Sequence, residues 1–321
     1  QPARTVSITD RRVQWPTWDQ WKRVLTLRDY NTRVVVFCTT LLGCAAGIIG
    51  SFTLLRRRAL MGDAISHATL PGIALAFMIA VSLGYNGKSL PILLTGATVS
   101  GLVGVGIVLL LRNLTRLKED TALGAVLSVF FGAGVSLLGM IQQMEAGHAA
   151  GLEAFIYGKT ASMGAADARL IATAAAISLL VCLAFFRDFK LLCFDDQFAS
   201  SAGYPVVLLD LLLMSLVVAV TIFGLQTVGL ILMIALLVIP AAAARFWTQR
   251  MVRMVLVAGL LGAVSGMLGA ACSAILPRLP SGAMIVLVCT GFFLISLLFG
   301  GQRGVLVRWW RRRRLNQSIR Q

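Results

Sequence analysis

Apolar runs, each close to twenty residues long, recur along nearly the whole length of this chain and limit the folds that it can adopt. They cover residues 33–55, 61–83, 90–111, 121–141, 165–186, 206–223, 226–245, 252–276 and 282–300. A helix of about 20 predominantly apolar residues spans the hydrocarbon core of a bilayer. Only 13% of the 321 residues are charged, against about 25% in soluble proteins. The sequence therefore predicts an all-α fold, a polytopic bundle of transmembrane helices.

The number of spans is eight or nine, because one stretch can be divided in two ways. Residues 205–245 are long enough for two helices, with a predicted division near Phe223–Gln226. The alternative is that one of the two is broken or re-entrant. Pro240 lies within this stretch, where a proline removes a helix hydrogen bond and kinks or ends the span.

Basic residues predict the orientation of the bundle in the membrane. When the connections are assigned alternately to two sides, one side holds Arg56, Arg57, Arg58, Arg112, Arg116, Lys118, Arg187, Lys190, Arg245, Arg250, Arg253, Arg303, Arg308 and Arg311–Arg314. The other side holds Lys88, Lys159, Arg169 and Arg278. Because short cytoplasmic loops carry the excess of Lys and Arg, the first side is predicted to be cytoplasmic. The net charge of +16 is then explained by these loops, and no nucleic-acid partner is predicted.

The bundle is predicted to have two flanking segments. Residues 1–32 form a basic arm with several tryptophans, which we expect outside the cytoplasm or at the membrane interface. A cleaved signal before Gln1 is one explanation for its basic residues on that side. The transmembrane domain is predicted at 33–300, and 301–321 form a basic cytoplasmic tail.

The most informative polar residues open the second run. Asp63 and His67 are four residues apart, so a helix places both on one face, about 5–6 Å apart at Cβ. Ionisable residues inside a membrane are costly and usually face a cavity or a partner. A carboxylate and an imidazole suit Mn, Fe(II) or Zn. The alternatives are that Asp63 caps the helix or pairs with Arg58, while His67 makes a packing hydrogen bond.

Other polar residues are candidates of different kinds. Asp195, Ala199 and Gly203 recur every four residues in a polar segment on the cytoplasmic side, so we expect one face of a short helix with room for a partner. Asp210 lies near the cytoplasmic end of its span, where it pairs with a neighbour or reaches the interface. Three residues of an outer loop, which solvation of the loop explains equally well, are candidates for metal capture: Glu145, His148 and Glu153.

Four stretches together resemble the permeases of bacterial zinc, manganese and iron ABC importers, the ABC-3 family. They are Gly62-Asp63 to His67-Ala68 after a basic run, Phe194 to Pro205, Thr227 to Ala242, and Pro280-Ser281-Gly282-Ala283 with the apolar run to Phe299. The resemblance covers roughly residues 33–300. It implies a type II ABC importer-like permease of the cytoplasmic membrane, with its C-terminus inside and its N-terminus outside.

The resemblance assigns roles to particular residues. It implies that Asp63 and His67 form the metal site of the translocation path, and that the helix with Pro240 lines this path. It also implies that the segment with Asp195, Asp196, Gln197, Ala199 and Gly203 is the helix that docks on the ATPase. Gln197 stands where the family usually has Glu, which puts one charged contact in doubt.

The expected function is therefore transport without covalent chemistry or a permanent cofactor. The cargo is Mn²⁺, Zn²⁺ or Fe²⁺, and the partners are a separate ATPase chain, an extracytoplasmic metal-binding protein, and a second copy or a sibling permease. A secondary carrier driven by an ion gradient is the alternative, although such carriers tend to place several ionisable residues at the midplane. A membrane enzyme would need a fuller set of reactive groups within the spans.

Overall fold

The computed structural model describes residues 29–58, 61–85, 87, 89–144, 164–275 and 281–309. Every regular element in these ranges is a helix. The helices are α2 (Tyr30–Leu55), α3 (Met61–Ser82), α4 (Leu90–Leu114), α5 (Glu119–Gln143), α7 (Ala165–Ala184), α8 (Phe186–Phe194), α9 (Asp196–Ser201), α10 (Val206–Val228), α11 (Leu230–Trp247), α12 (Met251–Ile275) and α13 (Ser281–Phe299). The predicted all-α class is confirmed.

The long helices coincide with the apolar runs. Eight helices in the described ranges are long and apolar enough to cross a membrane, and α11 is a shorter apolar helix beside them. The helix α2 begins at Tyr30, so the last residues of the predicted arm belong to a span, while residues 1–28 lie outside the described ranges. The predicted tail is described only as far as residue 309.

The long stretch after Pro205 forms two helices, but the predicted point of division is wrong. Helix α10 continues to Val228, and Gly229 separates it from α11. Gly229 has φ 86°, a conformation that glycine adopts without the steric penalty of a Cβ atom. The chain therefore breaks at Gly229, beyond the Phe223–Gln226 segment, because the glycine at position 224 remains helical.

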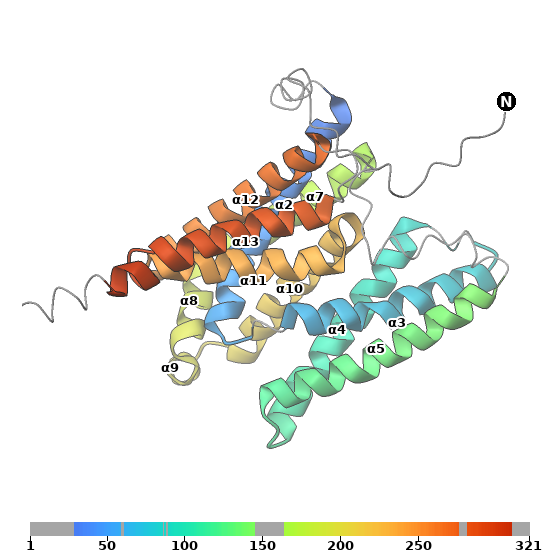
Figure 1. The fold of residues 1–321 in the computed structure, drawn as a ribbon. Coiled ribbons are helices and arrows are strands. Elements are labelled where there is room, and N and C mark those ends of the chain that lie inside the picture. The colour runs from blue at the N-terminus through green and yellow to red at the C-terminus, as the bar shows by residue number, and fades with distance from the viewer. Residues whose placement is uncertain are drawn as a thin grey trace, which may run out of the picture.

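The helices form two groups joined by α10. In Figure 1, α3, α4 and α5 lie together, apart from the group of α2, α11, α12 and α13. Helix α3 packs on α4 and α5, whereas α12 packs on α2 and α13. Helix α10 contacts members of both groups, namely α2, α3, α4 and α11.

Small residues determine the closest packing, which is between α2 and α12. A Cβ atom added at Gly43 would collide with the carbonyl of Gly262, and one added at Gly47 would collide with the carbonyl of Ala258. Glycines spaced three or four apart allow such backbone contact between transmembrane helices. Small residues therefore bring the backbones of these two helices together.

Candidate functional site

Asp63 and His67 lie on one face of α3, close to its start. The Asp63 Oδ1 atom is 3.4 Å from the His67 Nε2 atom. The Asp63 side chain is 34% exposed and the His67 side chain is 20% exposed. Both can therefore be reached from outside the packed core. A carboxylate in the first turn is also favoured by the helix dipole. The predicted pairing of these two side chains on one helix face is therefore present.

Helix α5 holds the imidazole of His67 from the side. The His67 ring meets the ring of Phe131 edge to face, with centroids 4.7 Å apart and an interplanar angle of 80°. The Nδ1 atom of His67 is buried, and it has no hydrogen-bond partner in the part of the chain that the structure describes. The ring is therefore oriented by packing and by Asp63. The alternative was a packing hydrogen bond of His67, and its buried Nδ1 atom makes none within the described residues.

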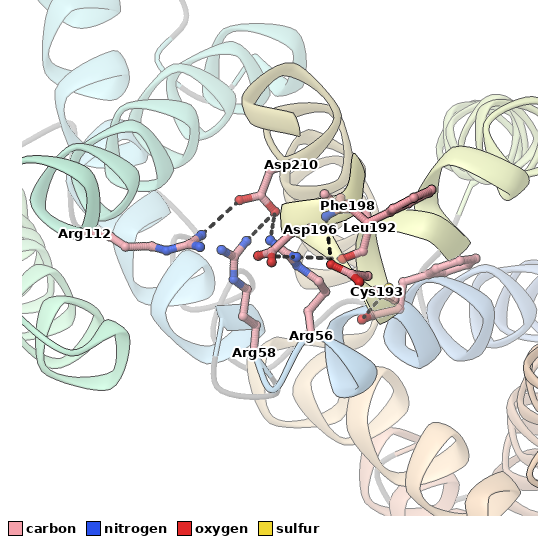
Figure 2. A network of polar contacts seen from close by, with 10 residues as sticks. Arg56, Arg58, Arg112, Leu192, Cys193, Asp196, Phe198 and Asp210 are labelled. Atoms are coloured by element: carbon pink, nitrogen blue, oxygen red, sulfur yellow. Dashed lines mark hydrogen bonds and ion pairs between the residues drawn. The ribbon is translucent and has the colours of Figure 1, made fainter. Parts of the chain in front are cut away.

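Arg58 does not pair with Asp63, so that alternative is wrong. Its Nη1 atom lies 2.6 Å from Asp210 Oδ1. Arg56 and Arg112 also reach the Asp210 carboxylate, at 3.2 Å and 3.3 Å. Figure 2 shows the three guanidinium groups converging on Asp210. We call Arg56, Arg58, Arg112 and Asp210 the arginine node. The expectation that Asp210 pairs with a neighbour is correct, but its three partners were not predicted.

A backbone turn directs two of these arginines to the same carboxylate. Helix α2 ends in a Schellman turn, in which the Arg58 amide bonds the Thr53 carbonyl and the Arg57 amide bonds the Leu54 carbonyl. Arg57 has φ 60° at the position where glycine is common. The turn leaves Arg57 exposed and Arg58 buried. A run of three arginines at a helix end was the sequence signal for this site.

The polar segment after α7 folds into two short helices, α8 and α9. The Asp195 carboxylate accepts a hydrogen bond from the Phe198 amide at 2.8 Å and so caps α9. Gly203 has φ 84° and ends α9 in a second Schellman turn, with the Tyr204 amide bonded to the Ala199 carbonyl. The predicted short helix is present, although it covers only Asp196–Ser201.

The predicted small-residue face of this helix is wrong at its central position. Ala199 is 1% exposed, so it packs against its own chain and leaves no room for a partner. The outward side chains are larger: Phe194 and Phe198 are 66% and 59% exposed, and Gln197 is exposed as well. Asp196 turns toward the bundle, with its Oδ2 atom 3.4 Å from Arg56 Nη1.

Pro240 is buried within α11, and the helix continues through it to Trp247. The proline therefore does not end the span. Its assigned place along the path remains a prediction.

No other candidate metal cluster is found in the described ranges. There, no group of three or more His, Cys, Asp or Glu side chains could hold an ion together. Glu145, His148 and Glu153 lie outside the described residues. Within the described chain, Asp63 and His67 therefore offer two ligands from protein side chains.

Comparisons with known proteins agree with this organisation. The model of the ABC 3 transport family matches residues 28–300. The chain is 44% identical over 293 residues to the manganese transport system membrane protein MntC of Bacillus subtilis, covering 91% of this chain and 66% of that protein, just under two thirds of its length. It is also 44% identical over 288 residues to the zinc transport system membrane protein TroC of Treponema pallidum, covering 90% of this chain and 95% of that protein.

A solved structure has the same fold. PsaBC from Streptococcus pneumoniae, solved in complex with Fab, matches with a TM-score of 0.75 at 29% identity, covering 92% of this chain and all of the matched chain. The family model covers most of the chain, and the membrane-spanning helices coincide with the matched region. This multi-pass membrane protein therefore belongs to the ABC 3 transport family.

Proposed function

We propose that this permease carries a divalent transition metal into the cell, driven by ATP, and that Asp63 and His67 hold the ion on its way. The observation that carries the proposal is the 3.4 Å separation of the Asp63 Oδ1 and His67 Nε2 atoms. Two ligand atoms that each lie about 2.1 Å from a tetrahedrally coordinated ion are about 3.4 Å apart. The two side chains are thus already spaced to share one ion, at the start of a membrane-spanning helix.

Two ligands do not complete a coordination shell, so the proposal includes a second permease. Two identical chains facing each other across an axis would supply two carboxylates and two imidazoles. A sibling permease with the same pattern would do the same. The partial exposure of both side chains supports this arrangement, because a fully enclosed pair could not meet a partner.

The surroundings of His67 suit a transported ion better than a structural one. Histidines that bind metal usually donate their other ring N–H to a carboxylate, carbonyl or water, which strengthens binding. In the described chain the buried Nδ1 atom of His67 has no such partner. The imidazole is instead held by the edge of Phe131. Weaker support of the ligand favours release, which a carrier requires.

The metal belongs to the group of Mn²⁺, Zn²⁺ and Fe²⁺. Oxygen and imidazole ligands suit these ions, and the pair contains no thiolate to favour copper. The two relatives at 44% identity are named for different metals, manganese and zinc. Overall similarity therefore does not distinguish between them, and the choice of ion has to be measured.

The proposed partners are a separate ATPase chain and an extracytoplasmic metal-binding protein. Phe194 and Phe198 are large apolar side chains that remain exposed on the short helices α8 and α9. Exposed apolar patches with a polar rim mark protein or membrane interaction sites, and the polar residues Asp195, Asp196 and Gln197 between these two phenylalanines favour a protein partner. We assign this surface to the ATPase, with α9 as the docking helix and with Asp195 and Gln197 at its edge.

The same surface supports the proposed orientation. Asp196 of α9 bonds Arg56, so α9 lies at the same end of the bundle as the basic connection between α2 and α3. Basic connections mark the cytoplasmic side. The ATPase surface and the C-terminus are therefore cytoplasmic, and the N-terminus lies outside.

The test is uptake of radiolabelled manganese, zinc and iron by cells that lack their own importers. The cells express this chain with its cognate ATPase and binding protein, as wild type, Asp63→Ala, His67→Ala, or the exposed control Asp120→Asn. We expect uptake of at least one metal in the wild type and the control, and loss of uptake in both site variants at equal membrane abundance. Unchanged uptake in Asp63→Ala and His67→Ala would place the metal elsewhere. Uptake that survives an inactive ATPase would identify a secondary carrier.

A further inference from the structure

The arginine node gathers three guanidinium groups around one carboxylate, and two of its four residues are almost fully buried. Asp210 is 4% exposed and Arg58 2% exposed. Three guanidinium groups reach the Asp210 carboxylate, at distances between 2.6 and 3.3 Å. Replacing a buried ion cluster by apolar residues is often neutral or stabilising, so stability alone does not account for such a cluster. A role in positioning is the better explanation.

The node joins helices that are far apart in the sequence. Arg56 caps the end of α2, Arg58 precedes α3, Arg112 lies in the last turn of α4, and Asp210 lies in the first turns of α10. One small carboxylate therefore holds the ends of four long helices. A rigid-body shift of any one of them changes the contacts of the other three.

Arg56 extends the node to the docking helix. Its Nη1 atom donates to the Leu192 carbonyl of α8 at 2.8 Å and lies 3.4 Å from Asp196 Oδ2 of α9, while its Nη2 atom reaches Asp210 (Figure 2). The planar guanidinium can bond several acceptors at once in a fixed geometry. A displacement of α9 must therefore either carry Arg56 with it or break one of these bonds.

Arg58 extends the node toward the metal site. It lies five residues before Asp63, and its carbonyl accepts a hydrogen bond from the Met61 amide at 3.0 Å, where α3 begins. Less than two turns of helix then lead from Met61 to His67. Movement of Arg58 is thus passed to the start of α3, where the two proposed ligands are.

We propose that Arg56, Arg58 and Asp210 are positioning residues that couple movement of α9 to the Asp63 and His67 pair. This inference rests on the proposed function, because it requires that α9 docks on an ATPase and that the pair holds the transported ion. Packed elements with charged contacts have discrete arrangements rather than a continuum. The node then has one set of contacts in each transport state, so that ATP-driven movement of α9 opens or closes the metal pair.

The experiment measures the number of metal ions transported per ATP hydrolysed, using the complete permease and ATPase complex in proteoliposomes with its binding protein. The first variant is Arg56→Lys, which keeps the positive charge but loses the planar guanidinium that bonds several acceptors. The second is Asp196→Asn, which removes the negative charge of the half-exposed α9 residue that Arg56 contacts. The third combines both changes. Asp188→Asn, on the neighbouring helix α8, is the matched control. Metal binding and thermal stability are measured for each purified complex.

We expect both single variants to lower the transport ratio by about tenfold, a typical size for coupling between sites. The double variant should lower the transport ratio no further than Arg56→Lys alone does, because both changes interrupt the same contact between Arg56 and α9. Metal binding, ATP hydrolysis and thermal stability should change much less than the transport ratio, and Asp188→Asn should keep the wild-type ratio.

Two results would overturn the inference while leaving the proposed function intact. One is a wild-type transport ratio in Arg56→Lys and Asp196→Asn. The other is a parallel loss of metal binding, hydrolysis and stability, which would indicate a purely structural role. Failure of the proposed function is recognised separately: the wild-type complex would then move no metal, or Asp63→Ala would bind metal as the wild type does.

Discussion

At the scale of single residues, two carboxylates near the same end of the bundle have opposite surroundings. The Asp63 side chain is 34% exposed and meets one imidazole, whereas that of Asp210 is 6% exposed and meets three guanidinium groups. Asp63 therefore keeps lone pairs for an incoming ion, while the lone pairs of Asp210 are committed to the protein. This difference separates a candidate ligand from a positioning group.

The sequence predicted the pairing of Asp63 with His67 but not the contacts of Asp210. Asp63 and His67 are four residues apart, so helical geometry alone brings them together. The partners of Asp210 are 98, 152 and 154 residues away. No local pattern reports such contacts, which depend on how four helices pack.

Asp210→Asn should lower the free energy of unfolding by about 3–5 kcal/mol, because it removes the buried negative charge that three guanidinium groups contact. Unfolding by denaturant in detergent micelles measures the effect. The exposed control Asp120→Asn should change stability by less than about 0.5 kcal/mol. Equal stability of the two variants would contradict the buried node.

The thiol of Cys193 on α8 should resist alkylation. Its Sγ atom lies 3.8 Å from the Phe52 carbonyl, and burial raises its pKa to about 12. The thiolate is the reactive form, so the raised pKa leaves little of the thiol reactive at pH 8, and the reactive fraction rises as the pH approaches the pKa. In a background without the other cysteines, maleimide labelling of Cys193 should be far slower than labelling of Ser200→Cys on the exposed side of α9. Equal labelling rates would contradict the restricted access to the half-buried Cys193 thiol.

At the scale of helices, apolar runs predicted where spans lie, and small residues determine how closely they pack. The division between α10 and α11 was misplaced because Gly224, an apparent breaker, stays helical, while Gly229 has the positive φ. Helix α8 was not predicted, since it is only nine residues long and mixes charged with aromatic residues. Its place is set by contacts with α2, α7 and α10.

Gly262→Ala should destabilise the bundle by about 1–3 kcal/mol, because the new methyl group would collide with the Gly43 carbonyl on α2. Gly291→Ala on α13 is the matched control, since a Cβ atom there meets nothing within 4 Å. The control should be neutral or stabilising by up to about 1 kcal/mol, because alanine favours helix over glycine. Thermal unfolding in detergent compares the two, and a more stable Gly262→Ala protein would contradict the close contact.

At the scale of the whole molecule, polar contacts place several connections at one end of the bundle. The arginine node brings together the ends of α2 and α4 with the starts of α3 and α10. Arg56 also joins it to the start of α9 through Asp196. The Gln302 amide after α13 bonds the Phe246 carbonyl at the end of α11 at 3.0 Å. These contacts agree with the alternation read from the basic residues, which needed only span lengths and charges.

One chain alone cannot supply the complete coordination shell of the metal. Asp63 and His67 are two ligands, and the described chain holds no larger group of His, Cys, Asp or Glu. A sequence reports the ligands on its own helices and nothing about a neighbouring copy. The proposed site therefore has a defined stoichiometry, in which two permeases share one ion.

The most direct test is the number of Mn²⁺ or Zn²⁺ ions bound per permease in the purified complex with its ATPase, reconstituted in lipid nanodiscs and measured by equilibrium dialysis with elemental analysis. We expect one ion for every two permease chains, lost in Asp63→Ala and in His67→Ala and retained in Asp120→Asn. One ion per single chain, or binding that persists in both site variants, would contradict this expectation.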